Sequence, residues 1–240
     1  KMKRLGVNID HVGTIRNARG SKHPDPLVIA KYVIECGAHS VTIHLREDRR
    51  HINDKDVFNI CKNKKIITNL EISLNDEIIK IALKNKPNFI CIVPEKRKEI
   101  TTEGGLNLQK NKAKIKKTIS LFNKKNIRTS LFIDPSLKDI KIAKELNANC
   151  VEIHTGKISN LIKNNKNFKN EYMKIKECSE LGKKLGMEIH AGHGLDYKTT
   201  TVLTKIKEIT EFNIGHFIIG ESLTNGLKNT IKSFKKIINK

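Results

Sequence analysis

Short apolar runs alternate with longer amphipathic stretches along the whole chain. Eight of these runs are rich in β-branched and aliphatic residues, which is typical of buried strands. They are Leu5–Ile9, Ser40–Leu45, Ile66–Ile72, Asn88–Val93, Arg128–Ile133, Asn149–His154, Met187–Ala191 and Glu211–Ile219. The stretches between them have helical spacing and helix-boundary residues, such as Asp25-Pro26 at one start and Gly37 at the same helix's end. The pattern therefore predicts strands that alternate with helices.

Eight strand–helix units in 240 residues match the size of a (β/α)8 barrel, so we expect residues 1–240 to form a single TIM-barrel domain. A doubly wound sheet is the alternative, but no GxGxxG motif follows the first run. Two segments have weak periodicity. We expect a loop after the first run, carrying Arg16 and Arg19, and an excursion or irregular helix over Ile158–Asn170. One helix, Glu221–Ile238, should close the chain.

Most of the predicted strands end in polar side chains that can carry chemistry. They are Asn8, Asp10 and His11; His44 and Arg46; Glu71; Glu95; Asp134; Glu152 and His154; His190 and His193; and His216, after Gly215. In a barrel the carboxyl ends of all strands meet at one face, where opposed imidazoles and carboxylates can exchange protons. Individual members have simpler interpretations. Asp134 also suits a helix start, His154 and His190 suit structural roles, and Glu95 could pair with Lys96 or Arg97.

The densest of these stretches is Ser40–Ile52, where a buried strand changes within one residue into histidines and arginines. Arginine suits a doubly charged phosphate, and histidine suits proton transfer near neutral pH. A solvated charge run after an edge strand is the alternative. The glycines in AGHGL and NIGH would let backbone N–H groups approach a ligand, as in the phosphate sites after barrel strands seven and eight.

The chain is strongly basic, with a formal net charge of +22. The excess is mostly Lys beside Asn on helix faces such as Lys110–Lys117, and the sequence has no nucleic-acid recognition motif. We expect no nucleic-acid partner, although a basic surface would attract phosphorylated small molecules. No apolar run approaches the roughly 20 residues of a membrane span. No signal peptide is visible, and the five cysteines have no CxxC spacing. We therefore expect a cytoplasmic protein without membrane contact, its cysteines reduced.

Metal chemistry is the rival interpretation of the strand ends. His44, Glu71, His190 and His193 could bind zinc or iron in a metal-dependent sugar-phosphate epimerase or aldolase. No local HxH or HExxH pattern supports this, and the many arginines favour phosphate over metal.

Several longer blocks span Gly6 to Gly220: GVNIDH with RNARG, VTIHLREDRRHI, NLE, VPEKR with TTEGG, SLFID, EIHTG, AGHGL and NIGH. Together they resemble the pyridoxine 5′-phosphate synthase family of bacterial vitamin B6 biosynthesis. Two features depart from the family pattern: His190 precedes AGHGL where Asn is expected in some relatives, and Val12-Gly13 stands in a loop that is often more apolar. Residues 157–170 carry no family motif, so that their role is open.

The resemblance implies a TIM barrel with extra helices, assembled as a homo-oligomer, an octamer in the family. It implies condensation of 1-deoxy-D-xylulose 5-phosphate with 3-amino-2-oxopropyl phosphate to pyridoxine 5′-phosphate, inorganic phosphate and water, with no metal and no cofactor. The catalytic residues it implies are His44, Glu71 and His193 for proton transfer and Glu152 for transition-state stabilisation. Contacts to the amino-ketone phosphate fall on Asn8, Arg19, Gly194, Gly215 and His216. Contacts to the deoxyxylulose phosphate fall on Asp10, His11, Arg46, His51 and Thr101.

Overall fold

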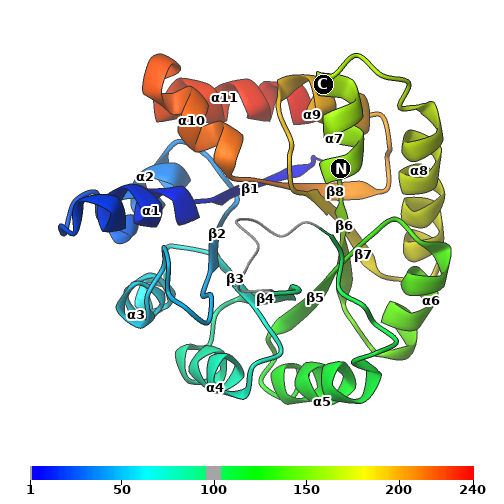
Figure 1. Cartoon of the computed structure of the whole chain (residues 1–240), viewed down its shortest axis with the longest axis horizontal. Coiled ribbons are helices and arrows are strands. Elements are labelled where there is room, and N and C mark those ends of the chain that lie inside the picture. Colours follow the sequence, from blue (N-terminus) through cyan, green and yellow to red (C-terminus); the bar gives the residue numbers. More distant parts are fainter. Residues whose placement is uncertain (1, 96–103) are drawn as a thin grey trace.

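Eight parallel strands close into a barrel in the computed structural model, in the order in which they occur in the chain (Figure 1). The structure describes residues 2–95 and 104–240. The strands are β1 (Arg4–Asn8), β2 (Ser40–His44), β3 (Thr68–Ile72), β4 (Phe89–Ile92), β5 (Arg128–Ile133), β6 (Cys150–His154), β7 (Glu188–Gly192) and β8 (Ile209–Ile214). Because β1 pairs with both β2 and β8, the sheet closes on itself. The predicted (β/α)8 barrel is confirmed.

The helices surround this barrel, and at least one follows each strand (Figure 1). Within the described residues they are α1 (Asp10–Arg19), α2 (Pro26–Glu35), α3 (Asp54–Lys62), α4 (Asp76–Asn85), α5 (Lys112–Asn123), α6 (Leu137–Glu145), α7 (Gly156–Lys163), α8 (Lys169–Lys184), α9 (Tyr197–Leu203), α10 (His216–Asn225) and α11 (Leu227–Ile238). Side-chain caps fix several starts: Asp25, for example, accepts a hydrogen bond from the Leu27 N–H at 2.8 Å.

Three of these helices are additions to the plain strand–helix repeat. α1, α7 and α10 each begin two residues after a strand ends, following β1, β6 and β8, and a second helix follows each of them before the next strand or the end of the described chain. Their amino-terminal ends therefore lie at the mouth of the barrel. Free N–H groups and the positive end of the helix dipole make such helix ends favourable for anions.

The structure corrects four boundaries predicted from the sequence. The loop expected after the first strand is helix α1, and residues 156–163 form the regular helix α7. The strand expected over Glu211–Ile219 is too long, because β8 ends at Ile214 and α10 begins at His216. The single closing helix is two helices, α10 and α11, separated at Gly226, whose φ of 73° is left-handed and ends α10.

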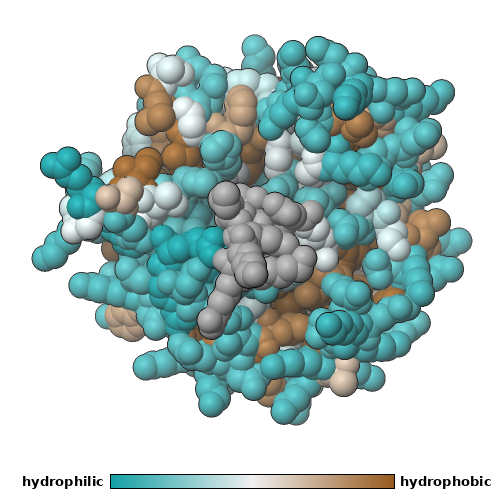
Figure 2. Space-filling model, viewed as in Figure 1, coloured by the Kyte–Doolittle hydropathy of each residue, from teal (hydrophilic) through white to brown (hydrophobic). Residues whose placement is uncertain are grey.

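Aliphatic side chains fill the space between strands and helices, with Phe122, Phe212 and Phe234 among the largest fully buried residues. The face seen in Figure 2 is mostly hydrophilic, with apolar side chains in scattered groups. The part of the chain that the structure describes has no helix long and apolar enough to cross a membrane.

Candidate active site

A cavity of about 280 Å³ opens at the carboxyl ends of the strands. Most of the candidate residues line it: Asn8, Asp10, His11, His44, Arg46, His51, Glu71, Glu152, His193, Gly194, Gly215 and His216. Val93, Phe132 and Asn213 line it too and are missed by the sequence reasoning. The apolar pair carries no chemical signal in a sequence, and Asn213 stands two residues before the Gly-His pair that drew attention.

His44 lies between two carboxylates at the ends of neighbouring strands. Its Nδ1 is 3.6 Å from Oε2 of Glu71, its register partner on β3, and its Nε2 is 3.7 Å from Oε2 of Glu95. Burial, followed by repulsion from Asp10 and Glu152, raises the pKa of Glu71 well above its ordinary value. The raised pKa favours the protonated form of Glu71, and His44 lies where it could exchange a proton with it.

Glu95 is turned into the site, although the sequence suggests a surface pair for it. Its side chain is only 2 % exposed, and it accepts a hydrogen bond from the backbone N–H of Glu47 at 2.9 Å. Burial alone would raise the pKa of Glu95, but the contacts with His44, the Glu47 N–H and Arg46 outweigh it and lower that pKa. The predicted partners Lys96 and Arg97 lie outside the described residues.

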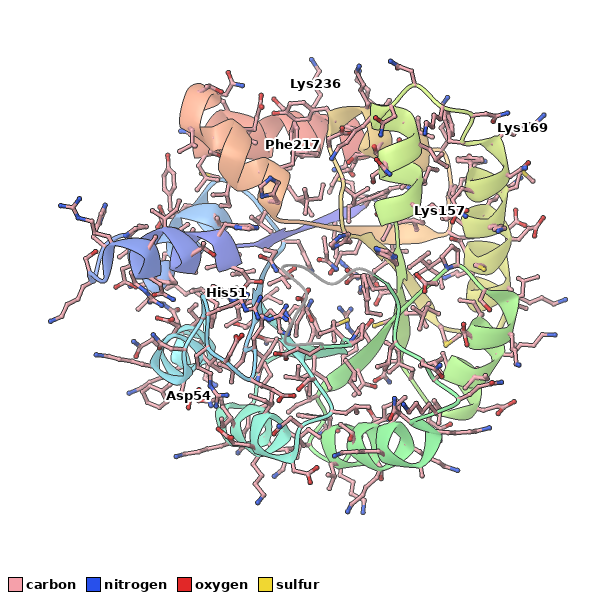
Figure 3. The ribbon with its side chains drawn as sticks, in the orientation of Figure 1. His51, Asp54, Lys157, Lys169, Phe217 and Lys236 are labelled. Atoms are coloured by element: carbon pink, nitrogen blue, oxygen red, sulfur yellow. The ribbon has the colours of Figure 1, made fainter. Side chains whose placement is uncertain are left out.

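The loop after β2 brings His51 to Asp10. Nδ1 of His51 is 3.8 Å from Oδ1 of Asp10 and accepts a hydrogen bond from the Ile52 N–H at 2.9 Å. That bond leaves the ring proton on Nε2, where it can be donated to a ligand. Asp10 also accepts the His44 backbone N–H, at 2.8 Å, which ties the start of α1 to the end of β2. Figure 3 shows His51 toward the middle of the barrel and Asp54 farther out, at the start of α3.

Helix α1 holds this loop in place from outside the cavity. Arg16 donates two hydrogen bonds to the Asp56 carboxylate, at 2.7 and 2.8 Å, and a third to the backbone oxygen of His51 at 2.9 Å. A Cβ atom at Gly13 would lie 2.5 Å from that same oxygen, so only glycine lets the helix approach so closely. The buried side of α1 thus carries a glycine and an arginine, which explains why its hydrophobic pattern is too weak to predict a helix.

Glu152 stands at the opposite side of the cavity, on β6. Its Oε2 accepts a hydrogen bond from Nδ2 of Asn213 at 2.6 Å, and the residue is 3 % exposed. Burial raises the pKa of Glu152 to about 7, against the lowering influence of His190 and of the Asn213 hydrogen bond. A carboxyl group with that pKa can either hold or release a proton in the cell.

His193 lies beside an imidazole–carboxylate pair. Nδ1 of His154 is 2.9 Å from Oδ1 of Asp134, and the rings of His154 and His193 have centroids 5.0 Å apart. Burial, then the charges of His154 and Lys163, lowers the pKa of His193 to about 4. His193 is therefore neutral at physiological pH and can accept a proton. Its backbone φ of 77° lies in the left-handed region, as does that of Gly194 at 75°. This conformation of the AGHGL segment directs the His193 side chain into the cavity.

His190 does not lie at the mouth, although the sequence places it at a strand end. It is the third residue of β7, and its ring nitrogens face Glu188 and Glu211, each at 3.8 Å. It therefore cannot join the metal-binding quartet that the sequence suggests. The described residues that could share a metal ion are Asp10, His44 and His51, whose ligand atoms lie within 4.8 Å of one another.

Among the described residues implied by the resemblance, Arg19 is not brought into the cavity. Arg19 is exposed at the carboxyl end of α1 and does not line it. Thr101 lies outside the described residues.

Comparisons with known proteins agree across the chain. A family model described as "Pyridoxal phosphate biosynthesis protein PdxJ" matches residues 5–240. A curated "Pyridoxine 5'-phosphate synthase" from Pelagibacter ubique (strain HTCC1062) is 82% identical over 239 residues, which covers 100% of both proteins. One of the same name from Zymomonas mobilis is 45% identical over 238 residues, covering 99% of this chain and 92% of that protein. A solved structure of tryptophan synthase from M. tuberculosis covers 100% of this chain and 93% of its own, with a TM-score of 0.65 at 8% identity, and shows the barrel fold alone.

Proposed function

The chain belongs to the PdxJ family of pyridoxal phosphate biosynthesis proteins, and we propose that it catalyses the ring closure of pyridoxine 5′-phosphate synthase. In this reaction 1-deoxy-D-xylulose 5-phosphate and 3-amino-2-oxopropyl phosphate combine to give pyridoxine 5′-phosphate, inorganic phosphate and water. The observation that carries the proposal is the single cavity lined by His44 and Glu71 on one side and by Glu152 and His193 on the other. The condensation needs several proton transfers around one bound intermediate, and these groups surround it.

The proposed division of work follows the ionisation of each group. His193 is neutral and can take a proton from the substrate amine or from a carbon next to a carbonyl. Glu71 has a raised pKa and can deliver a proton to a departing hydroxyl group, and His44 beside it can return the proton. Glu152 carries charge when ionised and can stabilise the positive charge that develops as the imine forms. These assignments rest on the geometry together with the family resemblance.

The two phosphates are proposed to bind on separate parts of the mouth. The first turn of α10 offers backbone N–H groups at Gly215 and His216, and a Cβ atom at Gly215 would lie 2.9 Å from Cβ of Asn8. The positive end of this helix suits the amino-ketone phosphate. Arg46, 3 % exposed at the mouth of β2, and His51 suit the phosphate of deoxyxylulose. That second phosphate is the one released, because the phosphorylated carbon of the product matches that of the amino-ketone.

Arg19 is proposed to contact the amino-ketone phosphate from the family resemblance alone. Its exposed position at the end of α1 gives this assignment no geometric support within one chain.

We also propose that the protein works as a cytoplasmic homo-oligomer, an octamer as in the family, and that residues 1–240 are one domain. Helices α1 and α2 expose the apolar side chains of Ile15, Val28 and Tyr32 at 48%, 58% and 42%, which supports burial against another copy. The five cysteines are free thiols, which suits a reducing compartment. Light scattering of the purified protein tests the assembly: a monodisperse monomer would contradict it.

The deciding experiment for the activity is a UV assay of pyridoxine 5′-phosphate formation from the two substrates, run with and without a chelator. Equal product formation in both samples is expected. Turnover that stops with the chelator would instead favour the metal-dependent epimerase or aldolase chemistry, with Asp10, His44 and His51 as the first ligands to test. No product under either condition would contradict the proposal.

A further inference from the structure

A row of ionisable side chains runs across the inside of the barrel on four neighbouring strands. In the strand register, Glu152 of β6 pairs with His190 of β7, His190 with Glu211 of β8, and Glu211 with Arg4 of β1. Register partners point to the same face of a sheet, which here is the barrel interior. Glu152, His190 and Glu211 are 3%, 2% and 1% exposed. The row joins the cavity at the mouth to the amino-terminal ends of the strands.

At the end of the row farthest from the cavity, the side-chain charges balance without a proton on His190. Arg4 donates from Nε to Oε2 of Glu211 at 2.7 Å and also pairs with Glu188. Arg128 donates to Oε2 of Glu188 at 2.8 Å. Two guanidinium groups thus balance two carboxylates. Because unbalanced charge is costly in a buried site, a proton on His190 is best compensated by ionisation of the next group in the row, Glu152.

The His190 ring lies among groups of both charges. Its Nδ1 is 3.8 Å from Oε1 of Glu211, a buried oxygen with no hydrogen-bond partner within the described part of the chain. Its Nε2 is 3.8 Å from Oε2 of Glu188 and 3.4 Å from Nη2 of Arg4. Three carboxyl groups, counting Glu152, therefore face the ring against one guanidinium group in direct contact.

Glu152 has one well-fixed neighbour besides His190. Asn213 holds its Oε2, and a Cβ atom at Gly192 would come within 2.0 Å of its Oε1, so the carboxyl group fills the space that this glycine leaves. Glu211 from β8 and His154 from its own strand also influence Glu152, while Glu152 in turn acts on Glu71 across the cavity and on the buried thiol of Cys91 on β4. Of the groups that favour its ionised form, His190 acts most strongly.

We propose that His190 is a positioning residue for Glu152: it gains a proton as Glu152 loses one, and so sets the charge that Glu152 presents to the substrate. The inference rests on the proposed function of Glu152.

The test compares His190→Asn and His190→Gln, which keep a polar side chain but cannot hold a charge. Two properties are measured against pH: kcat at saturating substrates, and the infrared carboxyl band of Glu152, identified by its loss in Glu152→Gln. Removing a positive neighbour should move the Glu152 titration, and the limb of the kcat profile that depends on it, to higher pH by about one unit or more. The matched control is His39→Asn. This exposed histidine lies near Arg4 and Glu211 but outside the row, and its replacement should leave both curves in place.

The outcomes separate this inference from the proposed function. Unchanged carboxyl titrations in both His190 variants would overturn the coupling, whatever the activity. A carboxyl titration that moves while the kcat profile stays fixed, with Glu152→Gln still active, would retain the coupling and reject the function proposed for Glu152. The use of two variants keeps the test valid if one of them fails to fold.

Discussion

Gly192 lies directly against the Glu152 carboxyl group, so closely that a Cβ atom at position 192 would be 2.0 Å from Oε1 and 2.9 Å from Cδ. The two residues sit on neighbouring strands, and the contact leaves Glu152 with one position in the barrel. The first glycine of AGHGL is therefore required for packing against an acid, and not only for a backbone approach to phosphate.

Gly192→Ala should displace Glu152 while leaving the phosphate-binding turns in place. A displacement of about 1 Å at a reacting group costs on the order of 100-fold in rate. We therefore expect kcat to fall by about that factor with little change in either KM. The control is Gly220→Ala on the exposed part of α10, where the new methyl group meets nothing within 4 Å and activity should be unchanged. Normal kcat in Gly192→Ala would show that the position of Glu152 does not limit the reaction.

His44→Gln and Glu71→Gln should each fold normally and lose about 10²–10⁴-fold in kcat, because each removes one member of a proton-transfer pair. The fold-loss in kcat of the double variant should be smaller than the product of the two single losses, because the two residues act as a unit. Steady-state kinetics of the three variants measure this, with the exposed His23→Gln as control. Losses that multiply in the double variant would mean that the two groups serve separate steps.

The raised pKa of Glu152 predicts how stability depends on pH. An acid whose pKa rises on folding, here from 4.5 to about 7, binds its proton more tightly in the folded state. Its favourable contribution is complete below the unfolded value and is lost as pH rises through about 7. Glu152→Gln cannot ionise and can still accept the Asn213 hydrogen bond. Its Tm should therefore match that of the unsubstituted protein at about pH 5 and exceed it at about pH 8.5. The corresponding gain in the free energy of unfolding at the higher pH is on the order of 3 kcal/mol.

Thermal unfolding followed by circular dichroism at several pH values measures that difference. Glu180→Gln on the surface of α8 is the control and should show no such pH trend. A Tm difference that is the same at both ends of the pH range would mean that Glu152 ionises in the folded barrel as it does in water.

Arg46→Lys should mainly raise the KM for 1-deoxy-D-xylulose 5-phosphate. A lysine cannot reproduce a two-bond guanidinium contact to phosphate, and a charge-assisted contact of about 1.5–3 kcal/mol corresponds to roughly 10–150-fold. Initial rates with each substrate varied in turn provide the measurement. Arg50→Lys on the same loop is the control, because Arg50 points to Asp48, with Nη2 and Oδ2 2.6 Å apart. An equal increase in both KM values for Arg46→Lys would contradict separate phosphate sites.

The basic surface should matter little to catalysis. Lys116 and Lys117 are exposed on α5. Replacing both with Glu should leave kcat unchanged and lower kcat/KM modestly at low salt, an effect that disappears as salt is added. A loss of kcat would place α5 at a required subunit contact.

The sequence predicts the strands well because a strand buried on both sides is an almost continuous apolar run, and polar residues stand at or near the carboxyl end of most of these runs. His44, Glu71 and Glu152 are found in this way, because a parallel barrel brings the polar residues in the carboxyl-terminal part of its strands to one face, whatever the register. The helix ends are found where Asp25, Asn53 and Asn75 cap them.

What the sequence cannot predict depends on contacts between distant segments. Helix α1 is hidden because its buried side packs through Gly13 and Arg16 rather than through a hydrophobic stripe. The inward turn of Glu95 depends on its reaching His44 and the Glu47 N–H across two strands. How far His190 lies below the mouth of the barrel depends on the register of β7 with β6 and β8, and no local sequence pattern encodes that register.

The ion pairs of Arg4, at the amino-terminal end of the barrel, also limit when the protein can finish folding during its synthesis. Arg4 lies on the first strand of the barrel, but its partners Glu188 and Glu211 follow 184 and 207 residues later. Local helices and the early strands can form while synthesis continues, whereas pairing across such separations is slow and must wait for the last strand. Until β8 arrives, the Arg4 guanidinium group has water in place of its carboxylates, and the nascent chain remains an open sheet with a free edge. Closure of the barrel and neutralisation of the Arg4 ion pairs are thus one late event, completed only after β8 has been made.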